Sequence, residues 1–293
     1  MPAEIGLHVI AVAYGDPTLL DGALEELGPD YRVTIVDNSS LAETRDVAER
    51  HGARYLDAGG NVGFGAGVNI ALRALADGGA IRDDVLLLNP DARIRAAGVR
   101  RMHEVLRSDP RIAAVGATQT EPGTGAPVRV WWPFPTPWRA WLEAIGLGAL
   151  DRAHDFAIGS LLLLRAEAIQ QVGHFDERFF LYAEETDWQK RATDAGWRIA
   201  IADVEATHVG AGTGGDSDRR EALFFASTER FQRKHHGTLG WQVFRAAMVA
   251  GATLRMLALR GEKADRARRR RDIFRTGPVA HLESLLAREG GLS

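Results

Sequence analysis

The sequence predicts an α/β protein with a mostly parallel central sheet flanked by helices. Segments of strand length alternate with segments of helix length through the first half of the chain, which favours parallel strands joined by right-handed crossovers. Residues 85–88 are four consecutive apolar residues, too short for a helix and typical of a strand buried on both faces. Hydrophobic residues make up 45% of the 293 positions, which is enough for a sizeable core.

The expected elements follow in chain order. Strands are expected at residues 7–13, 32–36, 53–56, 85–88, 112–116, 155–164 and 197–202. Helices are expected at 18–27, after 40 to about 51, after the glycine-rich segment 59–69, at 96–108, from 165, from 184, at 218–235 and at 239–259.

Composition excludes several classes of protein. The chain has no cysteine, so disulfides, thiolate metal sites and cysteine nucleophiles are excluded. A net charge of −3 argues against a nucleic-acid-binding protein. The first residues lack the pattern of a signal peptide, and no run of about 18 apolar residues predicts a membrane span. We therefore expect a cytoplasmic protein.

One carboxylate, Asp91, comes directly after the strand at 85–88, in the turn signal Asn89-Pro90-Asp91. Ligands of open α/β sheets bind at the carboxyl ends of the strands. A carboxylate there can hold a hard cation, which in turn can hold a diphosphate. The alternative is an aspartate that caps the next helix.

A polar cluster, Asp37-Asn38-Ser39-Ser40, ends the second expected strand. Asp37 could accept hydrogen bonds from a base or a ribose, and Asn38 could add a donor. The alternative is a helix N-cap formed by Ser39 or Ser40.

The segment 59–69 carries glycines at 59, 60, 63, 65 and 67. It fails the dinucleotide fingerprint, because Val68 stands where the third glycine should fall and because the segment follows the third strand. The glycines would let the backbone pass close to a ligand, with Asn61 and Asn69 offering amide groups to a nucleotide. The alternative is a turn that permits tight helix packing.

Three carboxylates, Glu184, Glu185 and Asp187, fall within four residues. The apolar run at 179–182 precedes them and could raise the pKa of a carboxylate towards that of a useful base. The alternative is an acidic first helical turn that complements the helix dipole. Further along, His208 precedes a glycine-rich loop at 209–215 and is a candidate metal ligand or pyrophosphate contact, or simply a packed residue.

Two later parts of the chain differ in composition from the residues that precede them. Residues 119–155 are rich in tryptophan and proline, which suits either an acceptor-binding segment or an aromatic satellite core. Residues 239–259 form a strongly apolar helix, and 260–275 are densely basic, with arginines at 268–271. Such a pair is typical of a membrane-surface contact. A solvated basic face, or a dimer interface formed by the helix pair, is the alternative.

Four motifs in order resemble family 2 glycosyltransferases with the GT-A fold, most closely the cell-wall and polysaccharide rhamnosyltransferases. They are Asp37-Asn38-Ser39-Ser40, Asn61-x-Gly63-Phe64-Gly65-x-Gly67-x-Asn69, Leu88-Asn89-Pro90-Asp91, and Phe175-Asp176-Glu177-x-Phe179-Phe180-x-Tyr182-x-Glu184-Glu185-x-Asp187. The resemblance covers residues 7–235. It implies a GT-A domain at 1–235, with a nucleotide-binding half at 1–118 and an acceptor half at 119–235, and a helical, basic extension at 236–293.

The resemblance also implies roles for single residues. Asp37 would hold the base or ribose, and Asn38, Asn61, Gly63, Asn69 and Asn89 would complete the donor site. Asp91 would be the last acid of the metal-binding D-x-D element, with His208 as the distal metal or diphosphate histidine. Glu185, beside Glu184, would be the catalytic base. Asn89 and Glu185 depart from the family's usual aspartates.

The implied activity is inverting transfer of a sugar to an acceptor hydroxyl with Mg²⁺ or Mn²⁺. The donor would be a nucleoside diphosphate sugar, with dTDP-L-rhamnose as the first candidate, and the acceptor a glycan or a polyprenyl-diphosphate-linked sugar at the inner face of the membrane. The implied partners include the membrane, through 239–275, or a second copy of the chain. An inactive sugar-nucleotide-binding module and a nicotinamide-dependent oxidoreductase are the competing hypotheses.

Overall fold

The computed structural model describes residues 6–76, 79–210 and 217–289. Its centre is a seven-stranded sheet in the order β12-β6-β11-β4-β1-β2-β3. The strands are β1 (Leu7–Ala13), β2 (Arg32–Asp37), β3 (Arg54–Asp57), β4 (Asp84–Leu88), β6 (Ile112–Ala117), β11 (Leu161–Leu164) and β12 (Arg198–Ala202). All neighbours pair in parallel except β11, which runs antiparallel to both β4 and β6. The predicted mostly parallel sheet is confirmed.

Helices cover both faces of this sheet. One core lies under α1 (Pro17–Leu27), α2 (Ala42–Arg50) and α4 (Ala96–Ser108). The other core lies under α3 (Phe64–Leu75), α6 (Ala166–Val172) and α7 (Glu184–Asp194). The two sides of the sheet are thus both buried, which explains why β4 and β11 carry apolar residues without alternation.

Two small sheets stand beside the main one. The first contains β5 (Ala92–Ile94), β13 (Ala206–His208), β7 (Gln119–Thr120) and β8 (Pro127–Val128). The second pairs β9 (Trp131–Trp132) with β10 (Phe156–Ala157). The single strand expected at 155–164 is therefore wrong: the chain bends at residues 158–160, so that β10 and β11 belong to different sheets.

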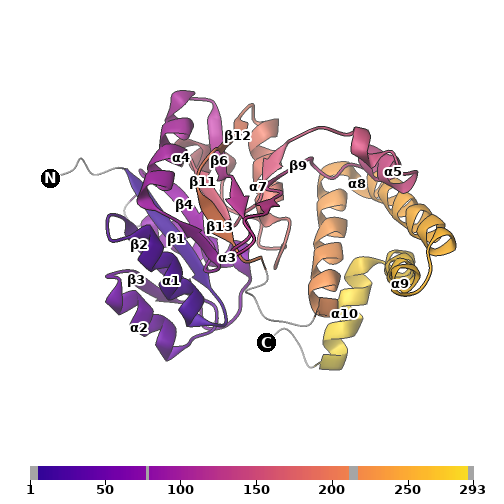
Figure 1. Cartoon of the computed structure of the whole chain (residues 1–293), viewed down its shortest axis with the longest axis horizontal. Helices are drawn as coiled ribbons and strands as arrows, with labels where there is room; N and C mark the ends of the chain where they lie inside the picture. Colours follow the sequence, from indigo (N-terminus) through magenta and orange to yellow (C-terminus); the bar gives the residue numbers. More distant parts are fainter. Residues whose placement is uncertain (1–5, 77–78, 211–216, 290–293) are drawn as a thin grey trace.

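A helical part stands on one side of the sheet, at the right in Figure 1. It consists of α5 (Pro137–Ala144), the short 3₁₀ helix η1 (Gly148–Leu150), α8 (Ser217–Ala258), α9 (Glu262–Thr276) and α10 (Pro278–Glu289). Gly237, with φ 65° and ψ −171°, breaks α8 into two halves. These halves are the two helices that the sequence predicts at 218–235 and 239–259. Ala140, Trp241 and Phe274 lie at the centre of this part's own core.

Candidate active site

A cavity of about 410 Å³ opens at the carboxyl ends of the central strands. Val12 lies near the end of β1, Asn38 follows β2, and the turn after β4 contributes Asn89, Pro90 and Asp91. The first residues of α7 and α8 complete the lining. This is the edge of the sheet at which α/β proteins bind their ligands.

Asp91 and His208 meet on one wall of this cavity. Their Oδ1 and Nε2 atoms lie 3.3 Å apart, and both side chains are largely buried. The pairing has a structural cause: β13 runs antiparallel to β5 with His208 opposite Ala92, and the Val209 N–H donates to the Asp91 carbonyl. The described part of the chain contains no cluster of three or more His, Cys, Asp or Glu side chains able to hold a metal ion. This pair would therefore supply two ligands.

Glu184 and Glu185, at the start of α7, also line this cavity. Oε2 of each carboxylate is buried with no hydrogen-bond partner among the described residues. Burial raises the pKa of Glu184 well above 4.5, and the neighbouring charge of Glu185 adds to the rise. Burial also raises the pKa of Glu185, although backbone N–H groups, including that of Gly159, oppose the shift.

Both glutamates line the same cavity. Residues that are adjacent on a helix point about 100° apart, which predicts that only one of them faces the site. That expectation is wrong, because Glu184 and Glu185 are the first two residues of α7 and the cavity lies off the end of the helix. The backbone that leads into this end is unusual: Tyr182 and Ala183 both have positive φ, 68° and 67°.

The glycine-rich segment packs against that lead-in. Gly63 has φ 89°, and a Cβ there would sit 2.2 Å from the carbonyl oxygen of Phe180. The Phe64 N–H donates to the same oxygen at 3.1 Å. A Cβ on Gly65 would lie 3.3 Å from Cβ of Glu184. The glycines thus allow α3 to approach the residues that lead into Glu184 and Glu185, as the tight-packing alternative expects.

Asp37 and Asn38 are adjacent in the sequence but have different surroundings. Asp37 is fully buried, and its carboxylate accepts hydrogen bonds from the Ser39 and Leu41 N–H groups and the Tyr55 hydroxyl. It organises the loop after β2 and does not line the cavity, so its expected contact with a base or ribose is not supported; neither is the serine alternative, because α2 begins after Leu41 without a side-chain cap. Asn38 lines the cavity, donates to the Gly63 carbonyl, and keeps a buried Oδ1 without a partner in the described structure.

Asn61, Gly63 and Asn89 also line the cavity, whereas Asn69 does not. The Asn69 amide group donates to the Phe175 carbonyl and to Glu177, and its oxygen accepts from the Phe175 N–H. Its hydrogen-bonding groups are committed to this loop, so we remove Asn69 from the donor-binding set.

Sequence reasoning missed the cationic side of the cavity. Arg219 and Arg220, in the first turn of α8, line it together with the aromatic ring of Tyr182. The signal was available, since two adjacent arginines follow the glycine-rich loop after His208. Of that loop, residues 211–216 lie outside the described part of the chain. The arginines bring positive charge to the cavity and are suited to binding an anionic group.

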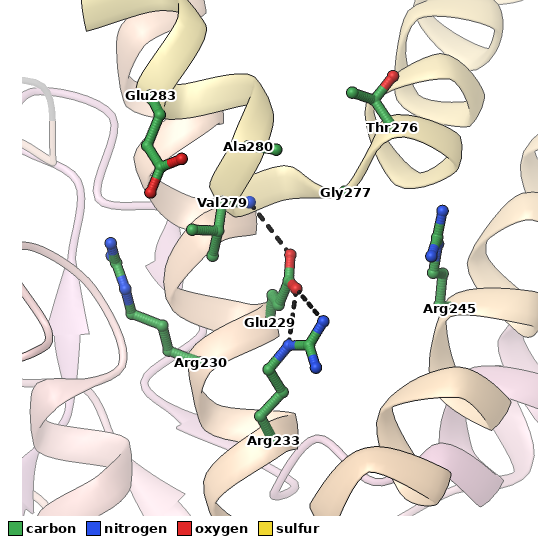
Figure 2. A pocket seen from close by; sticks show the side chains of 9 residues that line it. All are labelled: Glu229, Arg230, Arg233, Arg245, Thr276, Gly277, Val279, Ala280 and Glu283. Carbon is green, nitrogen blue, oxygen red and sulfur yellow. Dashed lines mark hydrogen bonds and ion pairs between the residues drawn. The ribbon is translucent and has the colours of Figure 1, made fainter.

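A second cavity lies between α8 and the α9–α10 turn (Figure 2). At its centre, Glu229 pairs with Arg233 at 2.8 Å and accepts a hydrogen bond from the Val279 N–H at the start of α10. Glu229 therefore joins α8 to α10. Because this carboxylate already occupies the middle of the cavity and caps the helix, we assign the cavity a structural role.

A family model described as glycosyl transferase family 2 matches residues 9–173, which is more than half of the chain. The chain belongs to this family. It is 30% identical over 266 residues to the N-acetylglucosaminyl-diphospho-decaprenol L-rhamnosyltransferase of Mycobacterium tuberculosis, covering 80% of this chain and 86% of that protein. It is 29% identical to the low-salt glycan biosynthesis hexosyltransferase Agl10 of Haloferax volcanii, over 64% of this chain and 61% of that protein.

Solved structures confirm the GT-A-like fold of this glycosyltransferase. A mannosyltransferase from Pyrobaculum calidifontis, in complex with GDP-Man and Mn²⁺, superposes with a TM-score of 0.58 at 15% identity, covering 96% of this chain and 79% of that one. Glucosyl-3-phosphoglycerate synthase from Mycobacterium tuberculosis gives a TM-score of 0.52 at 15% identity, over 78% and 79% of the two chains. At these identities the likeness concerns the fold alone.

Proposed function

We propose that this glycosyltransferase moves a hexosyl group, with inversion, from a nucleoside diphosphate sugar to a hydroxyl of a lipid-linked acceptor. One observation carries the proposal: a single cavity is lined both by two glutamates that each have an unpartnered carboxylate oxygen and by the Asp91–His208 pair. Such a site can offer a base to the acceptor hydroxyl and an electrostatic anchor to the diphosphate of the sugar donor. L-Rhamnose from dTDP-L-rhamnose is the first candidate sugar, because the relative with 86% coverage is named a rhamnosyltransferase.

Asp91 and His208 would hold a divalent cation, Mg²⁺ or Mn²⁺. A carboxylate oxygen and an imidazole nitrogen 3.3 Å apart suit Mn²⁺ and are acceptable to Mg²⁺ through the carboxylate. Solved structures of the same fold are named with Mn²⁺ or Mg²⁺. When bound, the ion would neutralise the charge that develops on the leaving diphosphate. Arg219 and Arg220 would share this task, because two protein ligands leave much of the diphosphate charge uncompensated.

Glu185 would be the base, in our proposal. It removes the proton from the acceptor hydroxyl while that oxygen bonds to the anomeric carbon, and the bond from this carbon to the diphosphate oxygen breaks on the opposite face. Burial and the neighbouring charge favour the protonated form of Glu184. That state leaves Glu185 as the carboxylate of the pair that is ready to accept a proton. Asn38, with its unpartnered Oδ1, would bind the nucleoside.

The acceptor would carry a polyprenyl diphosphate, like the substrate in the name of the mycobacterial relative. An acceptor of this kind lies in a membrane, so the enzyme would work at the cytoplasmic face of a bilayer. Within the described residues, no helix is long and apolar enough to cross a membrane. We retain, as part of the proposal, a catalytic domain at 1–235 with nucleotide and acceptor halves at 1–118 and 119–235, and a helical extension at 236–293.

A two-stage assay tests the proposal. Thermal shifts with dTDP-, UDP- and GDP-sugars, with and without Mn²⁺, identify the donor, and we expect the largest stabilisation from one sugar nucleotide with metal. Transfer from that donor to polyprenyl-diphosphate-linked N-acetylglucosamine is then followed by mass. A product heavier by one deoxyhexose supports rhamnosyl transfer. Donor binding with neither transfer nor hydrolysis would favour the inactive binding module instead.

A further inference from the structure

The helical part exposes most of the large apolar side chains that remain at the surface of the described structure. On α5 and η1 these are Trp138, Ile145, Leu147 and Leu150, and on the second half of α8 they are Leu239, Val243, Leu254, Leu257 and, just beyond, Leu259. Trp138, Leu239 and Leu257 are 69%, 78% and 74% exposed. Surfaces of this kind mark a contact with a protein or a membrane.

On α8 these side chains form one stripe. Leu239, Val243, Leu254 and Leu257, with the exposed Ala246 and the half-buried Ala250 between them, follow one another at intervals of three or four residues. At about 100° per residue, they occupy a sector roughly 80° wide. The stripe contains no charged or polar side chain.

A second stripe, on α5, faces the same way. The two helices run side by side in the same direction: Pro137 lies beside Gly240, and Ala144 lies beside Gly251. Trp138, Leu142 and Ile145 follow at i, i+4 and i+7. On each helix, the stripe lies about 100° round the helix axis from the side that contacts the other helix. The two rotations have opposite senses, so both stripes project from the same side of the helix pair. We call these nine residues the apolar face.

The basic helix α9 packs on the other side of α8. Arg245 donates to the Phe274 carbonyl at 2.7 Å, and Arg271 contacts the sulfur of Met256 at 3.2 Å. These contact positions lie about 120–140° round α8 from the middle of its apolar stripe. Of the four arginines at 268–271, Arg270 and Arg271 turn inward against α8, and only Arg268 and Arg269 are exposed. The apolar stripe of α8 and the exposed arginines of α9 therefore lie on different sides of α8.

We propose that the apolar face lies in the interfacial layer of an anionic bilayer, with α9 behind it at the level of the lipid headgroups. This proposal rests on the proposed function, which places the acceptor in a membrane. An interfacial helix sinks its apolar side about 5–10 Å below the headgroups. A second helix packed behind it stands about 8–10 Å further out, where Arg266, Arg268 and Arg269 meet lipid phosphates.

Charge favours a bilayer over a second copy of the chain as the occupant. Residues 255–275 carry nine Lys and Arg against three Asp and Glu, in a protein whose net charge is −3, so this part is matched to an anionic surface and would repel itself. A dimer interface also needs about one hydrogen bond per 100–200 Å², and among the nine residues of the apolar face only Trp138 has a side chain that can make one, through its indole N–H. Hydrocarbon requires none, and Trp138 suits the interfacial layer.

Two double variants with the same change in net charge distinguish insertion of the apolar face from electrostatic attraction alone. Leu254→Glu/Leu257→Glu and Arg268→Gln/Arg269→Gln each lower the net charge by two. The leucines lie on the apolar stripe of α8, whereas the arginines lie on α9, which packs on the other side of α8. Binding of the full chain to vesicles of phosphatidylcholine with 30% phosphatidylglycerol would be measured by co-sedimentation at about 0.1 M and 1 M salt. We expect the leucine pair to weaken binding on the order of 100-fold at both salt concentrations. The arginine pair should weaken it about tenfold, and only at low salt.

Separate readouts keep this inference distinct from the proposed function. All four positions are exposed, so the thermal midpoint and donor binding of both variants should match the wild type, and transfer to a short-chain, water-soluble acceptor should persist. Equal losses for the two pairs, abolished by salt, would overturn insertion. A concentration-dependent dimer in sedimentation velocity that Leu254→Glu/Leu257→Glu dissociates, without vesicle binding by the wild type, would assign the face to a second copy instead.

Discussion

Glu184 and Glu185 each keep one carboxylate oxygen buried without a donor from the described residues. A carboxylate in that condition is costly to ionise, so the surrounding structure must hold it there, as is typical of groups kept for chemistry. The motif predicted the pair and its raised pKa values. It could not predict that both side chains reach one cavity, because this depends on the positive φ angles of Tyr182 and Ala183, for which neither residue type gives a signal.

The raised pKa of Glu184 predicts how stability depends on pH. A carboxyl group whose pKa is higher in the folded than in the unfolded state stabilises the fold fully below the unfolded value near 4.5, and this contribution is lost as pH rises towards the folded pKa. Glu184→Gln removes the ionisation, so the variant should exceed the wild type in thermal midpoint at pH 8 by more than at pH 4. An equal difference at both values would show that Glu184 ionises freely.

The raised pKa of Glu185 predicts the acid limb of the rate profile. The base must be ionised to take a proton, so kcat/KM should rise with pH through a midpoint above the ordinary 4.5 of a glutamate. Initial rates of transfer between pH 4.5 and 9 give this midpoint. A rate that is already at its maximum at pH 5 would contradict a buried glutamate base.

Asp91 gives a prediction about the metal. Asp91→Ala removes the carboxylate beside His208, so the variant should bind the donor nucleotide equally with and without Mn²⁺, while the wild type binds more tightly with it. Asp57→Ala is the matched control, because Asp57 ends the edge strand β3 of the same sheet but lies outside the cavity lining. Titration calorimetry measures both. Undiminished metal dependence in Asp91→Ala would remove Asp91 from the metal site.

The geometry of the site depends on the contact between two elements: the start of α3 packs against the residues that lead into α7. The glycines at 59–67 predict a close approach to the backbone, but either a bound ligand or a neighbouring backbone segment could be what approaches. Only the fold shows that the Phe180 carbonyl occupies the space beside Gly63. Local patterns thus identify where close approach occurs without saying what approaches.

Gly63→Ala should therefore disturb the site more than a glycine change usually does. The new Cβ meets the Phe180 carbonyl oxygen at 2.2 Å, and the backbone has positive φ. Gly59→Ala is the control, since Gly59 has φ 75° but nothing lies within 4 Å of its Cβ. We expect the control to lose about 1 kcal/mol of unfolding free energy from strain alone, and Gly63→Ala to lose more together with most of its activity. Equal losses in urea denaturation would mean that the loop before α7 yields freely.

For the whole molecule, alternation of segments predicted the layered α/β fold and the mostly parallel sheet. It could not predict that β11 runs antiparallel, because a fully buried apolar strand looks alike in either direction. Nor could it predict which sides of the helices in the last third pack against one another and which stay exposed. The basic run at 268–271 divides between a packed side and an exposed side of α9, and this division depends on helix packing that composition does not record.

The cavity brings together the turns after β2 and β4, His208 of β13 and the first residues of α7 and α8. Their convergence is the central claim of this account. Glu185→Gln keeps the shape and hydrogen bonds of the side chain but cannot accept a proton. Single-turnover transfer at saturating donor and Mn²⁺ should fall by about 10²–10⁴-fold, while the dissociation constant of the donor stays unchanged, and Glu184→Gln should lose less. Near-normal turnover by Glu185→Gln would contradict the account.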